Sequence, residues 1–148
     1  MTKPQAGDTH YFAYGSNLHM RQMQERCEDS VPMMRVKLKN YQLLFDGVAT
    51  IVPAPGKTVW GALYRVSSED IRHLDIYEGY PRLYRKETVW LEDDQGEQHR
   101  AFVYLLNREG QQPPQETYYL TIRAGYQHWK LPLEPLEDAL DRSYGMDS

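Results

Sequence analysis

The chain of 148 residues contains a single cysteine, Cys27, so it cannot form an internal disulfide. Because disulfides belong to oxidising compartments, this scarcity favours a reducing one, and we expect a cytoplasmic protein. The sequence also lacks any run of 18 apolar residues, so it predicts no membrane-spanning helix and no membrane partner. Residues 1–8 carry no apolar stretch of the kind found in a signal peptide.

Basic residues are not in excess. The net charge is −4, and the densest basic patch is the short stretch 82–86, so we expect no nucleic-acid partner. Hydrophobic and charged contents of 41% and 26% are ordinary for a soluble globular protein, and the length suits one domain. We expect a flexible N-terminal arm at residues 1–9 and a single domain at 10–148.

Several functional motifs are absent. There is neither a G-x-G-x-x-G sequence nor a Walker lysine, which disfavours nucleotide binding. Without a G-x-S-x-G elbow, Ser16 is predicted to cap a helix or contact a ligand rather than act as a nucleophile. The five histidines show no H-E-x-x-H or close Cys/His spacing, so we expect no metal site. Cys27 is interpreted as a half-buried structural thiol.

The most informative stretch that is present begins with residues 11–14, an aromatic and apolar run that suits a buried strand. Gly15 permits a sharp reversal, and Ser16 or Asn17 is predicted to cap a helix that starts near Leu18. Backbone N–H groups without partners then gather at the positive end of the helix dipole. This turn is therefore predicted to bind an anion.

Apolar periodicity and turn residues predict the remaining elements, which are helices packed on a mostly antiparallel sheet, an α+β fold. Strands are expected at about 10–14, 33–45 (with a break near Lys39-Asn40), 47–53, 58–66, 83–91 and 98–106. Helices are expected at about 17–27, 67–77, 116–130 and 135–142. Turns are expected at Pro55-Gly56 and Asp93–Gly96, and Gly61 indicates a bulge or the close approach of a backbone or a ligand.

One acidic residue breaks the apolar pattern of a helix. The helix capped by Ser67 and stopped near Gly79 has an apolar face at Ile71 and Leu74, and the next position of that stripe is Glu78. Either the helix ends first and Glu78 reaches solvent, or Glu78 points into a partly closed pocket. In a pocket, loss of hydration would raise its pKa, and it could then transfer protons near neutral pH.

The sequence contains two further patterns of acidic residues and tyrosines. Asp75 and Glu78 lie three residues apart, as paired glycosidase carboxylates would on a helix edge, but such spacing is common on solvated helices, so the pair carries little weight. Among the twelve tyrosines, Tyr11, Tyr14 and Tyr118 are candidates to present hydroxyl groups to a polar ligand.

Taken together, these motifs resemble the γ-glutamylcyclotransferase family over about residues 10–135. The matching segments are Tyr11 to Leu18, Gly47 to Pro53 with Pro55-Gly56, Val59-Trp60-Gly61, Leu74 to Gly79, and Leu131-Pro132-Leu133. They come in the order and approximate spacing of the family. The resemblance implies a small, mixed, barrel-like α/β domain.

The resemblance also implies an activity, namely cleavage of a γ-glutamyl amide by the substrate's own α-amino group, which releases 5-oxoproline and needs no cofactor. The general acid/base falls on Glu78. The substrate-binding residues fall on Tyr11, Phe12, Ala13, Tyr14, Gly15, Ser16, Asn17 and Tyr118. The turn amides would hold either the α-carboxylate or the reaction oxyanion. A homodimer is compatible with the family.

The leaving group stays open. Residues 80–85 look more like γ-glutamylamine cyclotransferases and bacterial relatives, whereas residues 47–51 and the Val-Trp-Gly strand look like enzymes acting on γ-glutamyl amino acids. Arg85 either contacts an anionic group or lies on the surface of a strand. A non-catalytic protein that binds a carboxylate metabolite at the Gly15 turn is the alternative from another class.

Overall fold

Five strands form a closed barrel in the computed structural model, which describes residues 9–145. In chain order the elements are β1 (Thr9–Ala13), the 3-10 helix η1 (Ser16–Leu18), α1 (Met20–Arg26), β2 (Val31–Asp46), β3 (Val48–Val66), α2 (Ser68–Glu78), β4 (Tyr84–Glu92), β5 (Gln98–Leu106), α3 (Glu116–His128) and α4 (Glu134–Ser143). The expected α+β class is confirmed.

The strand order around the barrel is β1-β3-β2-β4-β5. Each neighbouring pair is antiparallel except β1 and β5, which close the barrel in parallel where Tyr11 pairs with Phe102. The sheet is therefore mixed and mostly antiparallel, as expected. β1 begins at Thr9, one residue inside the expected N-terminal arm, and the rest of that arm lies outside the described residues.

The two longest strands correct the expected boundaries. β2 has 16 residues and β3 has 19, and each continues through a position where the sequence predicts an interruption, near Lys39-Asn40 in β2 and at Pro55-Gly56 in β3. The register shifts at this point, because Lys39 pairs with Thr58 and Tyr41 pairs with Pro53. The Gly56 amide donates to Oδ1 of Asn40 at 3.0 Å, and both residues have positive φ. The turn residues thus mark a bulge within two continuous strands.

Gly61 marks a close approach of two strands. A Cβ placed there would lie 2.2 Å from the carbonyl oxygen of Ala13 and 2.5 Å from Cε1 of Phe12. Phe12 and Ala13 are fully buried in the core of the barrel. The lack of a side chain at Gly61 therefore lets β1 pack closely against β3 just before the turn that follows Ala13.

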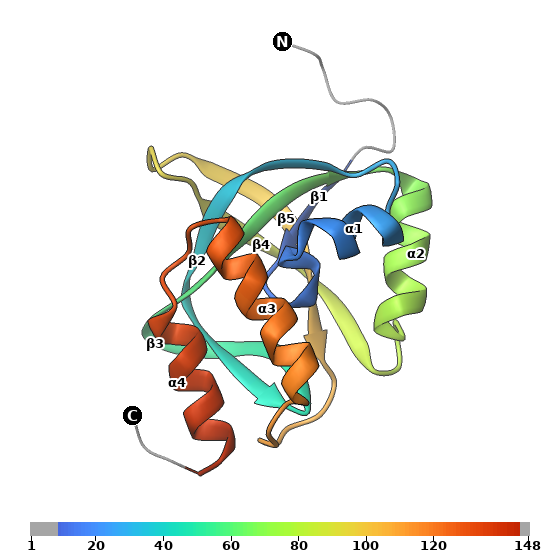
Figure 1. Ribbon diagram of the computed structural model, residues 1–148. Coiled ribbons are helices and arrows are strands. Elements are labelled where there is room, and N and C mark those ends of the chain that lie inside the picture. The colour runs from blue at the N-terminus through green and yellow to red at the C-terminus, as the bar shows by residue number, and fades with distance from the viewer. Residues whose placement is uncertain (1–8, 146–148) are drawn as a thin grey trace.

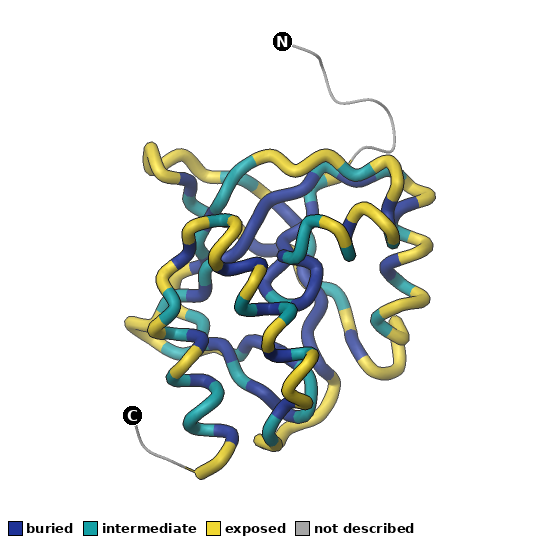
Figure 2. The backbone as a smooth tube through the Cα atoms, viewed as in Figure 1, coloured by how far each residue is buried: buried dark blue, intermediate teal, exposed yellow. Residues whose placement is uncertain are grey.

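The helices cover one side and one edge of the barrel (Figure 1). α3 packs on η1, where a Cβ at Gly125 would lie 2.5 Å from Cβ of Leu18, and α4 packs on β2. α2 stands at the edge of the barrel beside α1. Figure 2 shows the buried residues concentrated in the barrel and on the helix faces turned to it. Within residues 9–145, no helix is long and apolar enough to cross a bilayer.

Candidate active site

A cavity of about 200 Å³ lies where the turn after β1 meets the end of α2. Its lining comes from four regions that are far apart in sequence. The lining residues are Tyr11, Tyr14, Gly15, Ser16, Asn17, Val48, Ala49, Tyr77, Glu78, Leu83, Tyr84 and Tyr118. Six of the eight residues expected to bind the substrate line this space, here called the central cavity, together with Glu78. The other two, Phe12 and Ala13, lie in the buried core.

The turn does not cap a helix in the expected way. The Oγ of Ser16 lies 3.1 Å from the phenol oxygen of Tyr77, and Nδ2 of Asn17 donates to the phenol oxygen of Tyr11 at 3.0 Å. α1 begins later, and its N-cap is His19. The prediction that Ser16 or Asn17 caps a helix is wrong, because the Ser16 side chain contacts Tyr77 and the Asn17 side chain bonds to Tyr11 and Arg26.

The backbone of the turn retains donors near the cavity. The first hydrogen bond of η1 runs from the Leu18 amide to the carbonyl of Gly15 at 3.0 Å. The amides of Ser16 and Asn17 precede that bond, so they lie among the helix-terminal donors that have no intrahelical acceptor. Ser16 and Asn17 both line the central cavity.

Glu78 is the last residue of α2, one residue beyond the expected end of the helix. Gly79 follows in the left-handed conformation with φ of 67°, and its amide bonds to carbonyls of the last turn. Glu78 therefore keeps the helical register of Leu74, which is fully buried, and its half-buried carboxyl group lines the central cavity. This geometry favours the pocket interpretation over the solvent-exposed one.

Burial raises the pKa of Glu78 from its ordinary value of 4.5 to about 7. The positive charge of Arg26 lowers the pKa, but by less than burial raises it. Arg26 also donates to Oδ1 of Asn17 and stacks on the ring of Tyr77, with its guanidinium carbon 3.5 Å from the ring centroid. Near neutral pH, Glu78 is populated in both protonation states and can accept or donate a proton.

Four buried phenols surround the acid, and burial raises the pKa of each, so all are protonated near neutral pH. Tyr14 donates to the carbonyl of Tyr104 at 2.7 Å, and Tyr84 donates to the carbonyl of Ala49 at 2.7 Å. Tyr118 instead accepts from the amide of Ala49 at 2.9 Å, a bond that does not use its hydroxyl proton. Tyr118 thus has a proton to donate into the central cavity.

Three residues considered from sequence lie elsewhere. Oδ1 of Asp75 accepts from the phenol of Tyr104 at 2.7 Å and pairs with Lys86 at 2.8 Å, so Asp75 does not form a carboxylate pair with Glu78 in the cavity lining. Arg85 pairs with Glu87 at 2.9 Å on the strand surface. Cys27 is fully buried rather than half-buried, and burial raises its pKa to about 12, in keeping with a structural thiol.

Sequence reasoning missed several cavity residues. Val48 and Ala49 begin β3, and Leu83 and Tyr84 lie at the start of β4, where apolar residues look like ordinary core. Tyr77 could have been inferred from its place next to Glu78. Arg26 had no such signal, because its role follows from the packing of α1 against α2.

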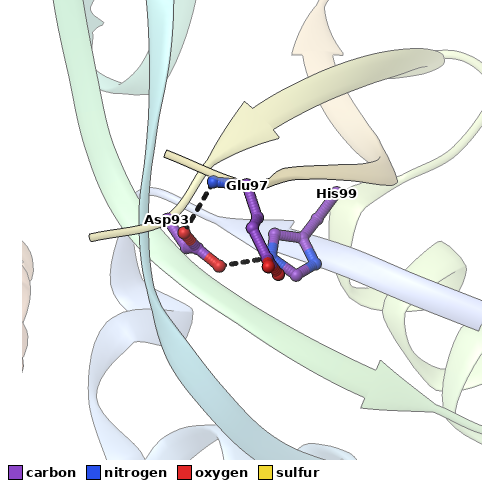
Figure 3. Close-up of side chains that lie close together, drawn as sticks. All are labelled: Asp93, Glu97 and His99. Atoms are coloured by element: carbon purple, nitrogen blue, oxygen red, sulfur yellow. Dashed lines mark hydrogen bonds and ion pairs between the residues drawn. The ribbon is translucent and has the colours of Figure 1, made fainter. Parts of the chain in front are cut away.

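A separate group of three possible metal ligands lies at the β4–β5 hairpin (Figure 3). One ligand atom from each of Asp93, Glu97 and His99 lies within 4.8 Å of the others. The histidine spacing did not reveal this group, because two of its members are acids. Asp93 already accepts from the amide of Glu97 at 2.9 Å and contacts Nε2 of His99 at 2.8 Å. These hydrogen bonds explain the cluster as a network that stabilises the hairpin. None of its three residues lines the central cavity.

Comparisons with known proteins agree on one family. The family model described as gamma-glutamyl cyclotransferase, AIG2-like, matches residues 11–130. The gamma-glutamylcyclotransferase of Homo sapiens is 28% identical over 147 residues, covering 90% of this chain and 78% of the relative. The gamma-glutamylcyclotransferase of Mus musculus is 30% identical over 144 residues, covering 88% and 77%.

Solved structures show the same fold. A structure named gamma-glutamyl cyclotransferase superposes with a TM-score of 0.81 at 25% identity, covering 95% of this chain and 88% of the other. The structure of YkqA from Bacillus subtilis superposes with a TM-score of 0.75 at 26% identity, covering 95% of this chain and 56% of the other. The barrel and its helices are thus similar to those of these proteins.

Proposed function

The chain belongs to the gamma-glutamyl cyclotransferase, AIG2-like family, and from this premise we propose that it converts a γ-glutamyl amide into 5-oxoproline and a free amine or amino acid. One observation carries the proposal. Glu78, with a pKa raised to about 7, faces the same cavity as the turn at Gly15 to Asn17. A proton carrier and a set of hydrogen-bond donors therefore meet around a space suited to a small polar substrate.

The proposed reaction is an intramolecular aminolysis. The substrate's α-ammonium group transfers a proton to the Glu78 carboxylate, and the resulting amine attacks the γ-carbonyl carbon to form the new C–N bond of the ring. Glu78 returns the proton to the leaving nitrogen, and the bond to that nitrogen breaks as the tetrahedral intermediate collapses. The ring nitrogen still carries a second proton, which the regenerated Glu78 carboxylate takes up and passes to the departing amine, so that the amine leaves as an ammonium. Atoms and charges balance, and each step uses only the substrate and this side chain, without a cofactor.

The cavity supports ring closure by holding the substrate bent. Well-oriented intramolecular reactions gain up to about 7–11 kcal/mol over their bimolecular counterparts. We assign the substrate's two anionic groups, the α-carboxylate and the developing oxyanion, to the amides of Ser16 and Asn17 and the hydroxyl of Tyr118. One preorganised donor to an oxyanion is typically worth about 2.7–4 kcal/mol.

The experiment that tests the proposal is a product assay. Purified protein is incubated with γ-glutamyl-alanine, and 5-oxoproline, alanine and glutamate are each quantified by chromatography. We expect 5-oxoproline and alanine in equal amounts, and no glutamate. Release of glutamate would identify a hydrolase, and calorimetric binding without any product would identify a non-catalytic carboxylate-binding protein. Either result would overturn the proposal.

A further inference from the structure

A second pocket adjoins the central cavity. It has a volume of about 270 Å³ and shares three lining residues with the central cavity, namely Ser16, Tyr77 and Tyr118. Tyr77 is 43% exposed, so this pocket, here called the rim pocket, lies at the surface of the protein. The contact between Ser16 and Tyr77 is part of the wall that the two spaces have in common. A substrate held in the central cavity can therefore extend into the rim pocket.

Arg26 supplies the positive charge of the rim pocket. Its Nη1 is engaged by Asn17, and its plane is stacked on Tyr77. These two contacts hold the guanidinium in one orientation. A guanidinium offers five donors in a rigid fork that matches a carboxylate, so the group retains donors that the bond to Asn17 does not use.

Gln22 lies one helical turn before Arg26 and lines the same rim pocket. Its Oε1 atom is buried and has no hydrogen-bond partner within the described residues. A buried polar atom without a partner is uncommon in folded proteins, so the Gln22 side chain has hydrogen-bonding capacity to offer a bound group. Since the amide can be rotated to exchange its oxygen and nitrogen, Gln22 can present either a donor or an acceptor to a bound group.

The part of the rim pocket that α3 lines is also polar. Thr117 and Thr121 of α3 line it, and the hydroxyl of Thr121 donates to the carbonyl of Thr117 at 3.0 Å. The hydroxyl oxygen of Thr121 is left as an acceptor. The rim pocket thus combines a fixed cation with neutral polar groups, which suits a small zwitterionic or anionic group better than an alkyl chain.

We propose that the rim pocket binds the leaving half of the substrate, and that Arg26 and Gln22 recognise the α-carboxylate of a leaving amino acid. This inference rests on the proposed function, since it assigns the glutamyl half to the central cavity. In a γ-glutamyl amino acid that carboxylate is two bonds from the nitrogen of the bond that breaks. It therefore falls beside the central cavity, where Arg26 lies. A γ-glutamyl amine has no such group and leaves Arg26 without an anionic partner.

The test compares two substrates that differ at this group, γ-glutamyl-alanine and γ-glutamyl-ethylamine. For the unmodified protein we expect kcat/KM to be at least about tenfold higher for γ-glutamyl-alanine, because hydrogen bonds between charged groups are the strong ones. Arg26→Gln should bring the ratio close to one, mainly by loss on γ-glutamyl-alanine. Arg26→Lys, which keeps the charge but not the fork, should give an intermediate ratio.

The matched control is Arg21→Gln, which removes an exposed arginine from the same helix outside the rim pocket and should leave the ratio unchanged. Circular dichroism checks that each variant is folded. Equal kcat/KM values for the two substrates in the unmodified protein would overturn the inference while the proposed function stands. An equal loss on both substrates in Arg26→Gln would do the same, because it would show that Arg26 only supports the turn. If neither substrate released 5-oxoproline, the proposed function and this inference would both be overturned.

Discussion

The hydroxyl of Ser16 lies 3.1 Å from the phenol oxygen of Tyr77, a contact between residues 61 positions apart in the chain. It joins the turn after β1 to the last turn of α2, directly beside Glu78. Arg26 stacks over the Tyr77 ring. The turn and the acid are therefore held together by side-chain contacts between η1, α1 and α2, and not by the barrel alone.

The close packing behind the turn makes Gly61 sensitive to substitution. In Gly61→Ala the added Cβ would lie 2.2 Å from the carbonyl oxygen of Ala13, and backbone cannot yield as a side-chain end can. We expect a loss of about 1–3 kcal/mol in the free energy of unfolding, measured by urea denaturation. Gly15→Ala is the comparison, because its Cβ would meet Ala49 at 3.5 Å, an ordinary contact. A loss at Gly61 no greater than at Gly15 would contradict the packing described.

Tyr118→Phe tests whether the hydroxyl of Tyr118 binds the substrate as well as the amide of Ala49. The substitution removes the hydroxyl that accepts from the Ala49 amide and removes the proton that we assign to the substrate. We expect KM to rise about tenfold, and the free energy of unfolding to fall by about 1–3 kcal/mol because the Ala49 amide loses its partner. Tyr119→Phe, at the next position of α3 and outside the cavity lining, should leave KM unchanged. An unchanged KM in Tyr118→Phe would show that the Tyr118 hydroxyl does not bind the substrate.

The rate should depend on the protonation of Glu78. Because burial raises its pKa to about 7, kcat/KM should fall about tenfold for each pH unit below that value, as the base becomes protonated. Arg26 lowers this pKa, so Arg26→Gln should move the acid limb of the profile to higher pH. The measurement is the pH dependence of 5-oxoproline release at low substrate concentration. An acid limb near pH 4.5 would show a solvated carboxylate.

The raised pKa of Glu78 should also make the stability of the fold depend on pH. A carboxyl group whose pKa is higher in the folded state binds protons more tightly there, so its contribution to stability is lost as the pH rises. A shift from 4.5 to about 7 corresponds to roughly 3 kcal/mol at most. Glu78→Gln should therefore match the unmodified protein below about pH 4.5 and be more stable above about pH 7. Urea midpoints measured across this pH range test the direction of the change in stability. A gain in stability confined to low pH would contradict the expected direction.

The sequence was most informative where local chemistry decides the structure. The turn at Asp93–Gly96 forms as predicted, with the Gly96 amide bonded to the carbonyl of Asp93 at 3.0 Å, because glycine readily adopts the positive φ required. Glu78 stands out in the sequence because it interrupts an apolar helix face, and in the structure it lines the central cavity. Both signals lie within a few residues, and no knowledge of the rest of the fold was needed.

The features that escaped prediction depend on contacts between distant segments. Asn40 and Gly56 looked like a break and a turn, but pairing along two long strands absorbs both into one bulge. The side chain of Ser16 suited a helix cap, but Tyr77 bonds to it instead. Arg26 and Gln22 carried no signal in the sequence, and only the packing around α1 places them in the rim pocket. The cytoplasmic location and the homodimer stay predictions.

Glu78→Gln tests the central claim most directly, because the substitution keeps the shape of the side chain and removes its ability to carry a proton. The measurement is the rate of 5-oxoproline release from γ-glutamyl-alanine, paired with calorimetric titration of the same substrate into the variant. We expect turnover to fall at least about a hundredfold, the lower range for general acid–base catalysis, while the dissociation constant changes little. Turnover within a few-fold of the unmodified protein would contradict the assignment of Glu78 as the general acid/base.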